Sequence, residues 1–240
     1  MRTLTGRKLS ALFSTLTYKL RRDGAMEVSR LLLHKFHSFY QRRRTRTQDT
    51  FDGEFGTDTE EIVPLWKLDI SSPYRSEGTR YQAIGAMPLR TAIDALPIDP
   101  REFSYVDLGS GKGRSLLVAS EYPFKRVLGI EFSEQLHCVA AENIRRYRSP
   151  KQKCKNLMSL CSDAAAYTFP PENTVVFLYN PFGEAVLSRV LQNLKASLRN
   201  GGFDVYIVYC SPVLASLLDQ EDFLERLDLP VSAAVYRSLR

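Results

Sequence analysis

The chain has 240 residues, of which 44% are hydrophobic and 25% charged, and its formal net charge is +6. These proportions are typical of a globular protein, and they exclude collagen-like, mucin-like and wholly disordered chains. The charge is unevenly spread, because residues 1–50 hold 12 Lys and Arg against three Asp and Glu, whereas the rest of the chain holds 21 against 24. The basic character therefore belongs to the N-terminal segment, and the remainder is mildly acidic.

The N-terminal segment, residues 1–50, is predicted to be a basic helical extension. Its apolar residues recur at helical spacing, first at Leu9, Leu12, Phe13, Leu16 and Leu20 and again over 26–40. An organellar transit peptide has a similar composition, but an amphipathic helix is the simpler interpretation. A basic run at 42–46 leads into an Asp-, Gly- and Thr-rich stretch at 49–60, which predicts a linker or irregular arm. Contact with nucleic acid or an anionic membrane surface is the alternative role for this arm.

Residues 51–100 are predicted to be a segment that precedes the core and ends in a helix over 79–96. Four apolar residues have the spacing of its buried face: Ile84, Met87, Ile93 and Leu96. A proline at position 97 closes this helix.

From residue 101 to residue 240, short apolar runs alternate with helical patterns. Strands are predicted at 103–108, 126–130, 156–161, 174–179 and 203–209, and two more at 223–229 and 232–239. Helices are predicted between them at 113–121, 133–147, 184–199 and 212–219. This alternation predicts an α/β fold, a doubly wound and mostly parallel sheet with helices on both faces.

The four cysteines predict neither a disulfide scaffold nor a metal site. No pair has CxxC spacing, and the side chains of the adjacent His137 and Cys138 would point apart on a helix. We therefore expect a reduced, cytoplasmic protein without a bound metal. No stretch approaches about 18 consecutive apolar residues, so neither a transmembrane helix nor a membrane partner is expected.

A glycine-rich segment between the strand at 103–108 and the next helix carries the clearest functional signal. It contains Asp107, Gly109, Ser110, Gly111 and Gly113. This is the place where open α/β sheets bind ligands, because glycines let the backbone approach closely and the helix N-terminus offers free N–H groups.

The spacing of this segment separates three ligand classes. A P-loop is excluded, because Lys112 is followed by Gly113 where Ser or Thr is needed. The dinucleotide fingerprint GxGxxG is matched only in part, since Arg114 stands where the last glycine should fall. The third class has an acidic residue before GxGxG, and Asp107 meets that condition.

Two further carboxylates follow the next two predicted strands. Glu131, next to Phe132, comes 22 residues after Gly109, where a carboxylate can bind the two ribose hydroxyls of an adenosine. Asp163 can accept a hydrogen bond from an adenine amino group. A helix-capping or solvent-facing role is the alternative for Glu131, and a plain helix N-cap is the alternative for Asp163.

The strand at 174–179 ends in a polar and aromatic group, Tyr179, Asn180, Pro181 and Phe182. An Asn side-chain carbonyl can hold a nucleophilic N–H, and an aromatic ring can cover a developing cation. A strand-ending turn is the alternative, because Asn-Pro commonly breaks a strand.

Together these residues resemble the class I S-adenosylmethionine-dependent methyltransferases over 101–240. The resemblance implies a Rossmann-like seven-stranded sheet in the order 3-2-1-4-5-7-6, with the terminal pair at 223–239 supplying the antiparallel seventh strand. It implies S-adenosylmethionine as the cofactor, with its methionine part wrapped by the loop at 107–113. It also implies that Glu131 binds the ribose and that Asp163 lies beside the adenine.

The stretches at 51–59 and 78–82 are similar to the region that precedes the core in a mostly uncharacterised group of bacterial methyltransferases. Proteins of that group also carry V-D-L-G-S-G-K-G-R and Y-N-P-F, as this chain does. The resemblance therefore extends over about 51–240 and leaves 1–50 unmatched, and it implies that Tyr81 lies near the cofactor mouth. The N-P-F element resembles the Asn-Pro-Pro-aromatic motif of enzymes that methylate amino or amide nitrogens, although the second proline is missing.

The resemblance thus implies an enzyme that transfers a methyl group by in-line displacement to a nitrogen of a protein lysine or small amine, a partner that the sequence does not identify. One alternative is an NAD-dependent oxidoreductase, which the partial GxGxxG and Glu131 favour and Arg114 disfavours. The other is a nucleic-acid-binding adaptor or RNA methyltransferase that uses the basic arm. A second basic cluster at 145–155 fits this role, although a solvated helix end is the simpler interpretation.

Overall fold

The computed structural model describes residues 51–199 and 201–239. The helices predicted within 1–50, and the prediction of that segment as a basic extension, lie outside the described residues.

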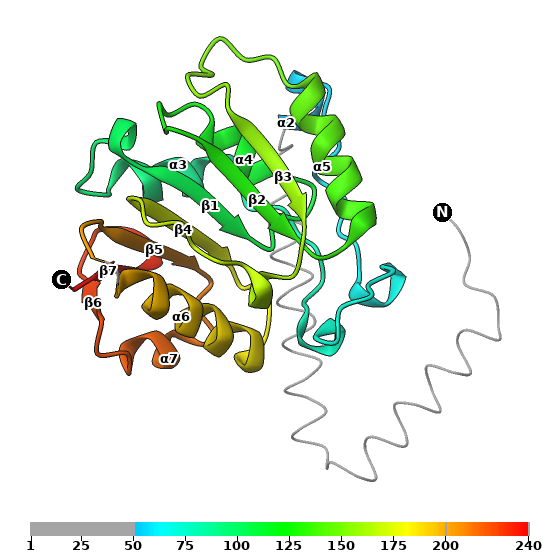
Figure 1. Cartoon of the computed structure of the whole chain (residues 1–240). Coiled ribbons are helices and arrows are strands. Elements are labelled where there is room, and N and C mark those ends of the chain that lie inside the picture. Colours follow the sequence, from blue (N-terminus) through cyan, green and yellow to red (C-terminus); the bar gives the residue numbers. More distant parts are fainter. Residues whose placement is uncertain (1–50, 200, 240) are drawn as a thin grey trace, which may run out of the picture. The chain divides into compact units, whose positions relative to one another are not determined.

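Seven strands form one mixed sheet in the order β3-β2-β1-β4-β5-β7-β6 (Figure 1). The five parallel strands are β1 (Ser104–Leu108), β2 (Val127–Glu131), β3 (Leu157–Cys161), β4 (Thr174–Tyr179) and β5 (Val205–Cys210). Strand β7 (Ala233–Ser238) is antiparallel to both β5 and β6 (Leu224–Leu227). This confirms the predicted strand order, which is that of the class I methyltransferase fold, with its antiparallel seventh strand.

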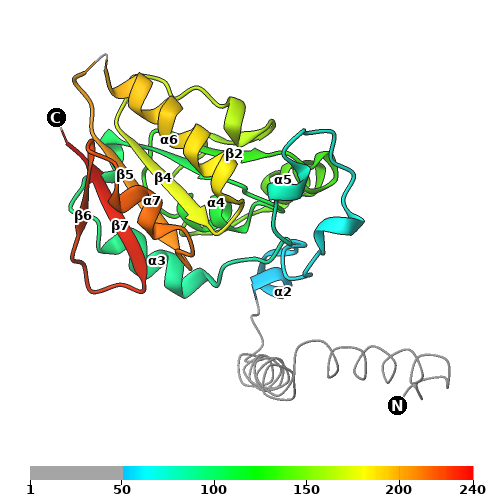
Figure 2. The same cartoon turned by 90° about the horizontal axis from the view of Figure 1, so that it is seen from below.

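Helices cover both faces of the sheet, with α3 and α6 on opposite sides (Figure 2). One face carries α3 (Ala86–Asp94), α4 (Arg114–Ala119) and α5 (Glu134–Arg146). The other face carries α6 (Glu184–Leu198), α7 (Ala215–Asp219) and the 3-10 turn η4 (Ala164–Ala166). Three more 3-10 turns are η1 (Leu65–Lys67), η2 (Arg75–Glu77) and η3 (Pro100–Glu102).

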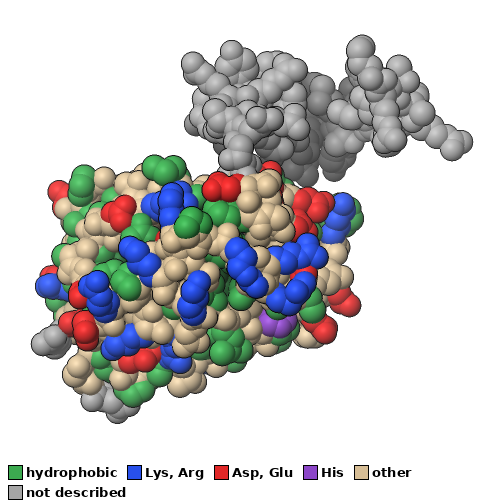
Figure 3. Space-filling view, turned by 90° about the horizontal axis from the view of Figure 1, so that it is seen from above, with side chains coloured by type: hydrophobic (Ala, Val, Ile, Leu, Met, Phe, Trp, Pro, Cys, Tyr) green, Lys and Arg blue, Asp and Glu red, His purple; other side chains and the backbone are tan. Residues whose placement is uncertain are grey.

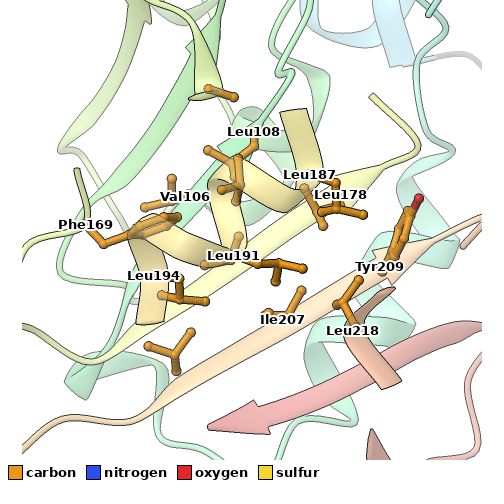
Figure 4. Packing of buried hydrophobic residues seen from close by; sticks show 14 of the residues in the cluster. Val106, Leu108, Phe169, Leu178, Leu187, Leu191, Leu194, Ile207, Tyr209 and Leu218 are labelled. Carbon is orange, nitrogen blue, oxygen red and sulfur yellow. The ribbon is translucent and has the colours of Figure 1, made fainter. Parts of the chain in front are cut away.

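The strands alternate their side chains between two buried cores, as the two-residue period of a strand requires. Val106 and Leu178 point toward α6 and meet Leu191, as Figure 4 shows. Tyr105 and Phe177 point to the other face and pack with α3 and α4. Because both faces are covered, these strands are buried along almost their whole length and are mostly apolar, which made them visible in the sequence.

The helix predicted over 79–96 begins later than expected, at Ala86. Pro88 explains the start, because a residue without an N–H fits only the first turn of a helix. The residues before it are extended, and Tyr81 pairs with Val63 in an isolated bridge. Met87, predicted on the buried face, is 66% exposed.

The stretch predicted as a linker is packed against the domain from residue 51 onward. It begins with the short helix α2 (Phe51–Phe55), and the Phe51 ring stacks on Tyr147 with the ring centroids 6.2 Å apart. The Asp52 carboxylate accepts hydrogen bonds from the backbone N–H groups of Thr59 at 2.6 Å and Glu60 at 2.7 Å. The polar residues that suggested a free linker therefore hold an ordered turn.

The second basic cluster, at 145–155, begins with two arginines that pair with a glutamate on α5. Arg145 pairs with Glu142 at 2.7 Å, and Arg146 also contacts Glu142. Lys and Arg side chains are spread over the face shown in Figure 3, with Asp and Glu side chains among them. These arginines at the end of α5 are thus partly neutralised on the surface.

The cysteines within the described part of the chain are all free, two buried and two exposed. In the same residues no three His, Cys, Asp or Glu side chains come together as a metal site. Among the helices of 51–199 and 201–239, none has the length and apolar character needed to cross a membrane.

Candidate cofactor-binding site

Three adjoining cavities lie at the carboxyl ends of the parallel strands, and Gly109 lines all three. Their empty volumes are about 330, 430 and 280 Å³. The first is lined by Asp163, the second by Glu131 and the third by Asp107. The structure therefore brings the three predicted carboxylates to one groove, with one of them in each cavity.

The glycine loop between β1 and α4 forms the floor of this groove. Gly109 and Gly111 have φ angles of +85° and +54°, in the left-handed region that favours glycine. A Cβ atom at Gly109 would overlap Pro181, and one at Gly111 would overlap the ring of Tyr81. Glycine is thus required at both positions by backbone conformation and by space.

Glu131, at the end of β2, is buried and turned toward the loop. Its carboxylate accepts hydrogen bonds from the backbone N–H groups of Gly111 at 2.8 Å and Ser133 at 2.9 Å. Burial raises the pKa of Glu131 to about 7, although these two hydrogen bonds oppose the shift. Each carboxylate oxygen keeps a further lone pair, so two more donors can be accepted. Ser133, rather than Glu131, provides the N-cap of α5.

Asp107, at the end of β1, is buried beside Ser115, whose hydroxyl donates to its carboxylate. Burial raises the pKa of Asp107 to about 7, the hydrogen bond from Ser115 opposes the shift, and the charge of Glu131 adds to it. The hydroxyl of Ser110 lies buried against Gly129 of β2, where a Cβ atom would come within 2.5 Å of it.

Asp163 begins the turn η4 and fills the capping role given as its alternative. One carboxylate oxygen accepts from the backbone N–H of Ala165 at 2.8 Å, and the other accepts from the hydroxyl of Ser72. Phe132 and Phe182 line the same cavity. Asp163 thus combines a capping role with a place beside two aromatic rings.

The group at the end of β4 does not converge on one point. Tyr179 lines the cavities of Asp107 and Glu131, whereas the buried Phe182 lines that of Asp163. Asn180, between them, has a φ of +44°, and its side-chain oxygen accepts from the Tyr209 hydroxyl at 3.4 Å. The two rings on either side of this left-handed residue thus line different cavities.

The segment before α3, residues 74–84, borders all three cavities. Tyr81 is the one residue of this segment that the sequence predicted at the site. Thr79 donates from its hydroxyl to the carbonyl of Asn180 at 2.9 Å and from its N–H to that of Pro181 at 3.2 Å. Gly78 pairs with Phe182, and the Tyr81 ring lies on Gly111. These residues have no periodic pattern, and the only signal was the run of Gly, Thr and aromatic residues at 78–82.

The two buried carboxylates make stability depend on pH. Their folded pKa values of about 7 exceed the usual values near 4, so the native state holds more protons than the unfolded state between these limits. The free energy of unfolding should therefore fall as the pH rises from about 4 to about 7, by roughly 1.4 kcal/mol per pH unit for each group. Urea unfolding of wild type and Asp107→Asn at pH 5, 6 and 7 measures this, and the variant should show the shallower fall. Equal slopes for the two proteins would contradict the assignment.

No protein-family model matches the chain, and no curated protein matches it by sequence. Several solved structures are similar. The 23S rRNA methyltransferase ErmE has 14% identity and a TM-score of 0.45, with 66% of this chain and 68% of that chain covered. An rRNA methylase from Streptococcus thermophilus has 14% identity and a TM-score of 0.40, with 64% and 96% covered. An RNA methyltransferase from Salinibacter ruber, in complex with S-adenosyl-L-homocysteine, has 21% identity and a TM-score of 0.40, with 65% and 91% covered. Likenesses at this level carry no argument about function.

Proposed function

We propose that this protein is an S-adenosylmethionine-dependent methyltransferase. One observation carries the proposal: Asp107, Glu131 and Asp163 each line one of three adjoining cavities that share Gly109. A ligand with an adenine, a ribose and an amino-acid part needs three such places in a row. The strand order of the sheet agrees with this assignment.

The residues present fit the cofactor at each cavity. The aromatic rings of Phe132 and Phe182 suit an adenine, and the Asp163 carboxylate suits its amino group. The free lone pairs of Glu131 suit two neighbouring ribose hydroxyls. The Asp107 carboxylate, in the third cavity, suits the ammonium group of the methionine part.

The chain's own contribution to the reaction is alignment and exclusion of water. When bound, the cofactor supplies a methyl group on a sulfonium centre, from which it can be displaced in line. Tyr179 lines the cavity of Asp107, together with Tyr81 and Phe177, and this supports a role for it in packing beside that methyl group. The side-chain oxygen of Asn180 keeps a second lone pair beside the Tyr209 contact, and it can orient the N–H of a nitrogen acceptor.

The structure disfavours the oxidoreductase alternative. The third glycine of a dinucleotide fingerprint allows close packing of the helix on the strand. Here Arg114 stands at that position as the first residue of α4, and its side chain is 3% exposed. A large charged side chain, held by Thr59 and Asp52, therefore stands where the fingerprint needs a glycine.

Calorimetric titration of the full chain with S-adenosylmethionine, S-adenosylhomocysteine and NADH tests the proposal. Binding of the first two ligands and no binding of NADH is the expected result. Tight NADH binding without binding of S-adenosylmethionine would overturn the proposal.

The methyl acceptor requires a second experiment, in which labelled S-adenosylmethionine is incubated with the protein and fractionated lysate. We expect label in protein or in small amines. Treatment of the labelled fractions with nuclease shows whether the acceptor is a nucleic acid. The names of the similar structures describe methyltransferases of rRNA or RNA. Loss of label on nuclease treatment would replace the amine acceptor with RNA or DNA.

A further inference from the structure

Two cations, one in the glycine loop and one at the start of α4, are buried beneath the acidic segment, residues 51–61. Lys112 and Arg114 are each only 3% exposed. The Lys112 ammonium lies 2.8 Å from the Asp58 carboxylate, and the Arg114 guanidinium lies 3.5 Å from the Asp52 carboxylate. A buried cation needs anionic partners of this kind. The acidic segment is therefore part of the structure that stabilises the glycine loop.

Thr59 lies at the centre of the contact and is fully buried. Its hydroxyl accepts a hydrogen bond from Nε of Arg114 at 2.6 Å and lies 2.6 Å from the Asp52 carboxylate, to which it donates. Its carbonyl accepts from the hydroxyl of Tyr81 at 2.7 Å. One residue thus joins the first turn of α4 to the aromatic ring that borders the groove.

The position of the Tyr81 ring matters for the groove. The ring lies on the backbone of Gly111 and lines the cavities of both Asp107 and Glu131. It does not line the cavity of Asp163. A shift of this ring would alter the two cavities assigned to the methionine and ribose parts and leave the adenine end intact.

We propose that Thr59 and Arg114 are positioning residues, which fix the Tyr81 ring against Gly111 and thereby set the shape of the methionine end of the groove. This role rests on the proposed function. Hydrogen bonds among buried and charged groups are stronger than exposed ones and hold a single geometry, so this network suits a positioning role.

The test compares Thr59→Val with Thr59→Ser, which differ in whether the hydroxyl is present. Calorimetry measures the binding of S-adenosylhomocysteine, which reaches all three cavities, and of adenine, which reaches only the cavity of Asp163. Thr59→Val should weaken S-adenosylhomocysteine by about tenfold and adenine by less than about threefold. Thr59→Ser should restore wild-type affinity for both ligands.

A second pair of variants keeps the test valid if Thr59→Val does not fold. Tyr81→Phe removes only the hydroxyl that donates to Thr59, and it should show the same selective loss. Tyr122→Phe is its control, because that hydroxyl donates to Asp94 at 2.8 Å, outside the groove. It should bind both ligands as wild type does.

The outcomes separate the two proposals. Wild type that binds both ligands, with Tyr81→Phe weakening both equally or neither, would overturn the positioning role alone. Wild type that binds neither ligand would overturn the proposed function, and this role with it. Thermal unfolding of each variant shows whether a uniform loss reflects a damaged fold.

Discussion

Glu131→Ala is expected to weaken the binding of S-adenosylhomocysteine by at least about 100-fold. In the proposed function the change removes two charge-assisted hydrogen bonds to ribose hydroxyls, each contributing about 1.5–3 kcal/mol. It also removes the carboxylate that accepts from Gly111 and so loosens the loop. Calorimetry at pH 8, where the carboxylate of wild type is ionised, measures the effect.

The control for this variant is Glu134→Ala, three residues further along on the exposed first turn of α5. Its affinity should stay within about twofold of wild type. A sharper readout is the ratio of the affinities for adenosine and 2′-deoxyadenosine. Wild type should prefer adenosine by about tenfold, and Glu131→Ala should lose this preference. A preference that survived the substitution would show that Glu131 does not bind the ribose.

Asn180→Ala is expected to lower single-turnover methyl transfer by about 100-fold while leaving the affinity for S-adenosylhomocysteine unchanged. In the proposed function the side-chain oxygen orients the acceptor, and small errors of orientation are costly to the rate of displacement. The measurement uses the acceptor fraction identified by labelling and a quenched-flow assay.

Two further variants separate the amide from the backbone. Because Asn180 has a φ of +44°, alanine at this position also introduces strain, which glycine avoids. Asn180→Gly should therefore be as slow as Asn180→Ala, and the exposed Asn156→Ala should be as fast as wild type. A full rate of transfer in Asn180→Gly would show that the side chain plays no part.

The sheet was predicted well because of where its strands lie. Thr174–Tyr179 has the predicted bounds, and the other core strands differ by one or two residues. Parallel strands buried on both faces are continuous apolar runs, and the glycine loop and the carboxylates follow them directly. The three acids were therefore found at the same edge of the sheet, as the pattern indicated.

The walls of the groove were harder to predict, because they depend on contacts between distant residues. Thr79 reaches Asn180, which lies 101 positions further along the chain. An extended segment of this kind has no periodic pattern that can be recognised in the sequence. Thr59 and Arg114 lie 55 positions apart, and each is buried partly by the other. The left-handed conformation of Asn180, which lies between Tyr179 and Phe182, was not indicated by the sequence pattern either.

The origin of the groove walls has a consequence for how the chain can be divided. Every strand of the sheet lies after residue 103, whereas Thr59, Thr79 and Tyr81 all come before residue 100. A fragment that began at residue 100 would keep the whole sheet and lose one wall of the groove. Contacts over such sequence distances form late, because loop closure costs more entropy as the loop grows. The smallest fragment with a complete groove is therefore longer than the smallest fragment that forms the sheet. Transfer of the sheet alone to another protein would not transfer the ligand specificity of the groove.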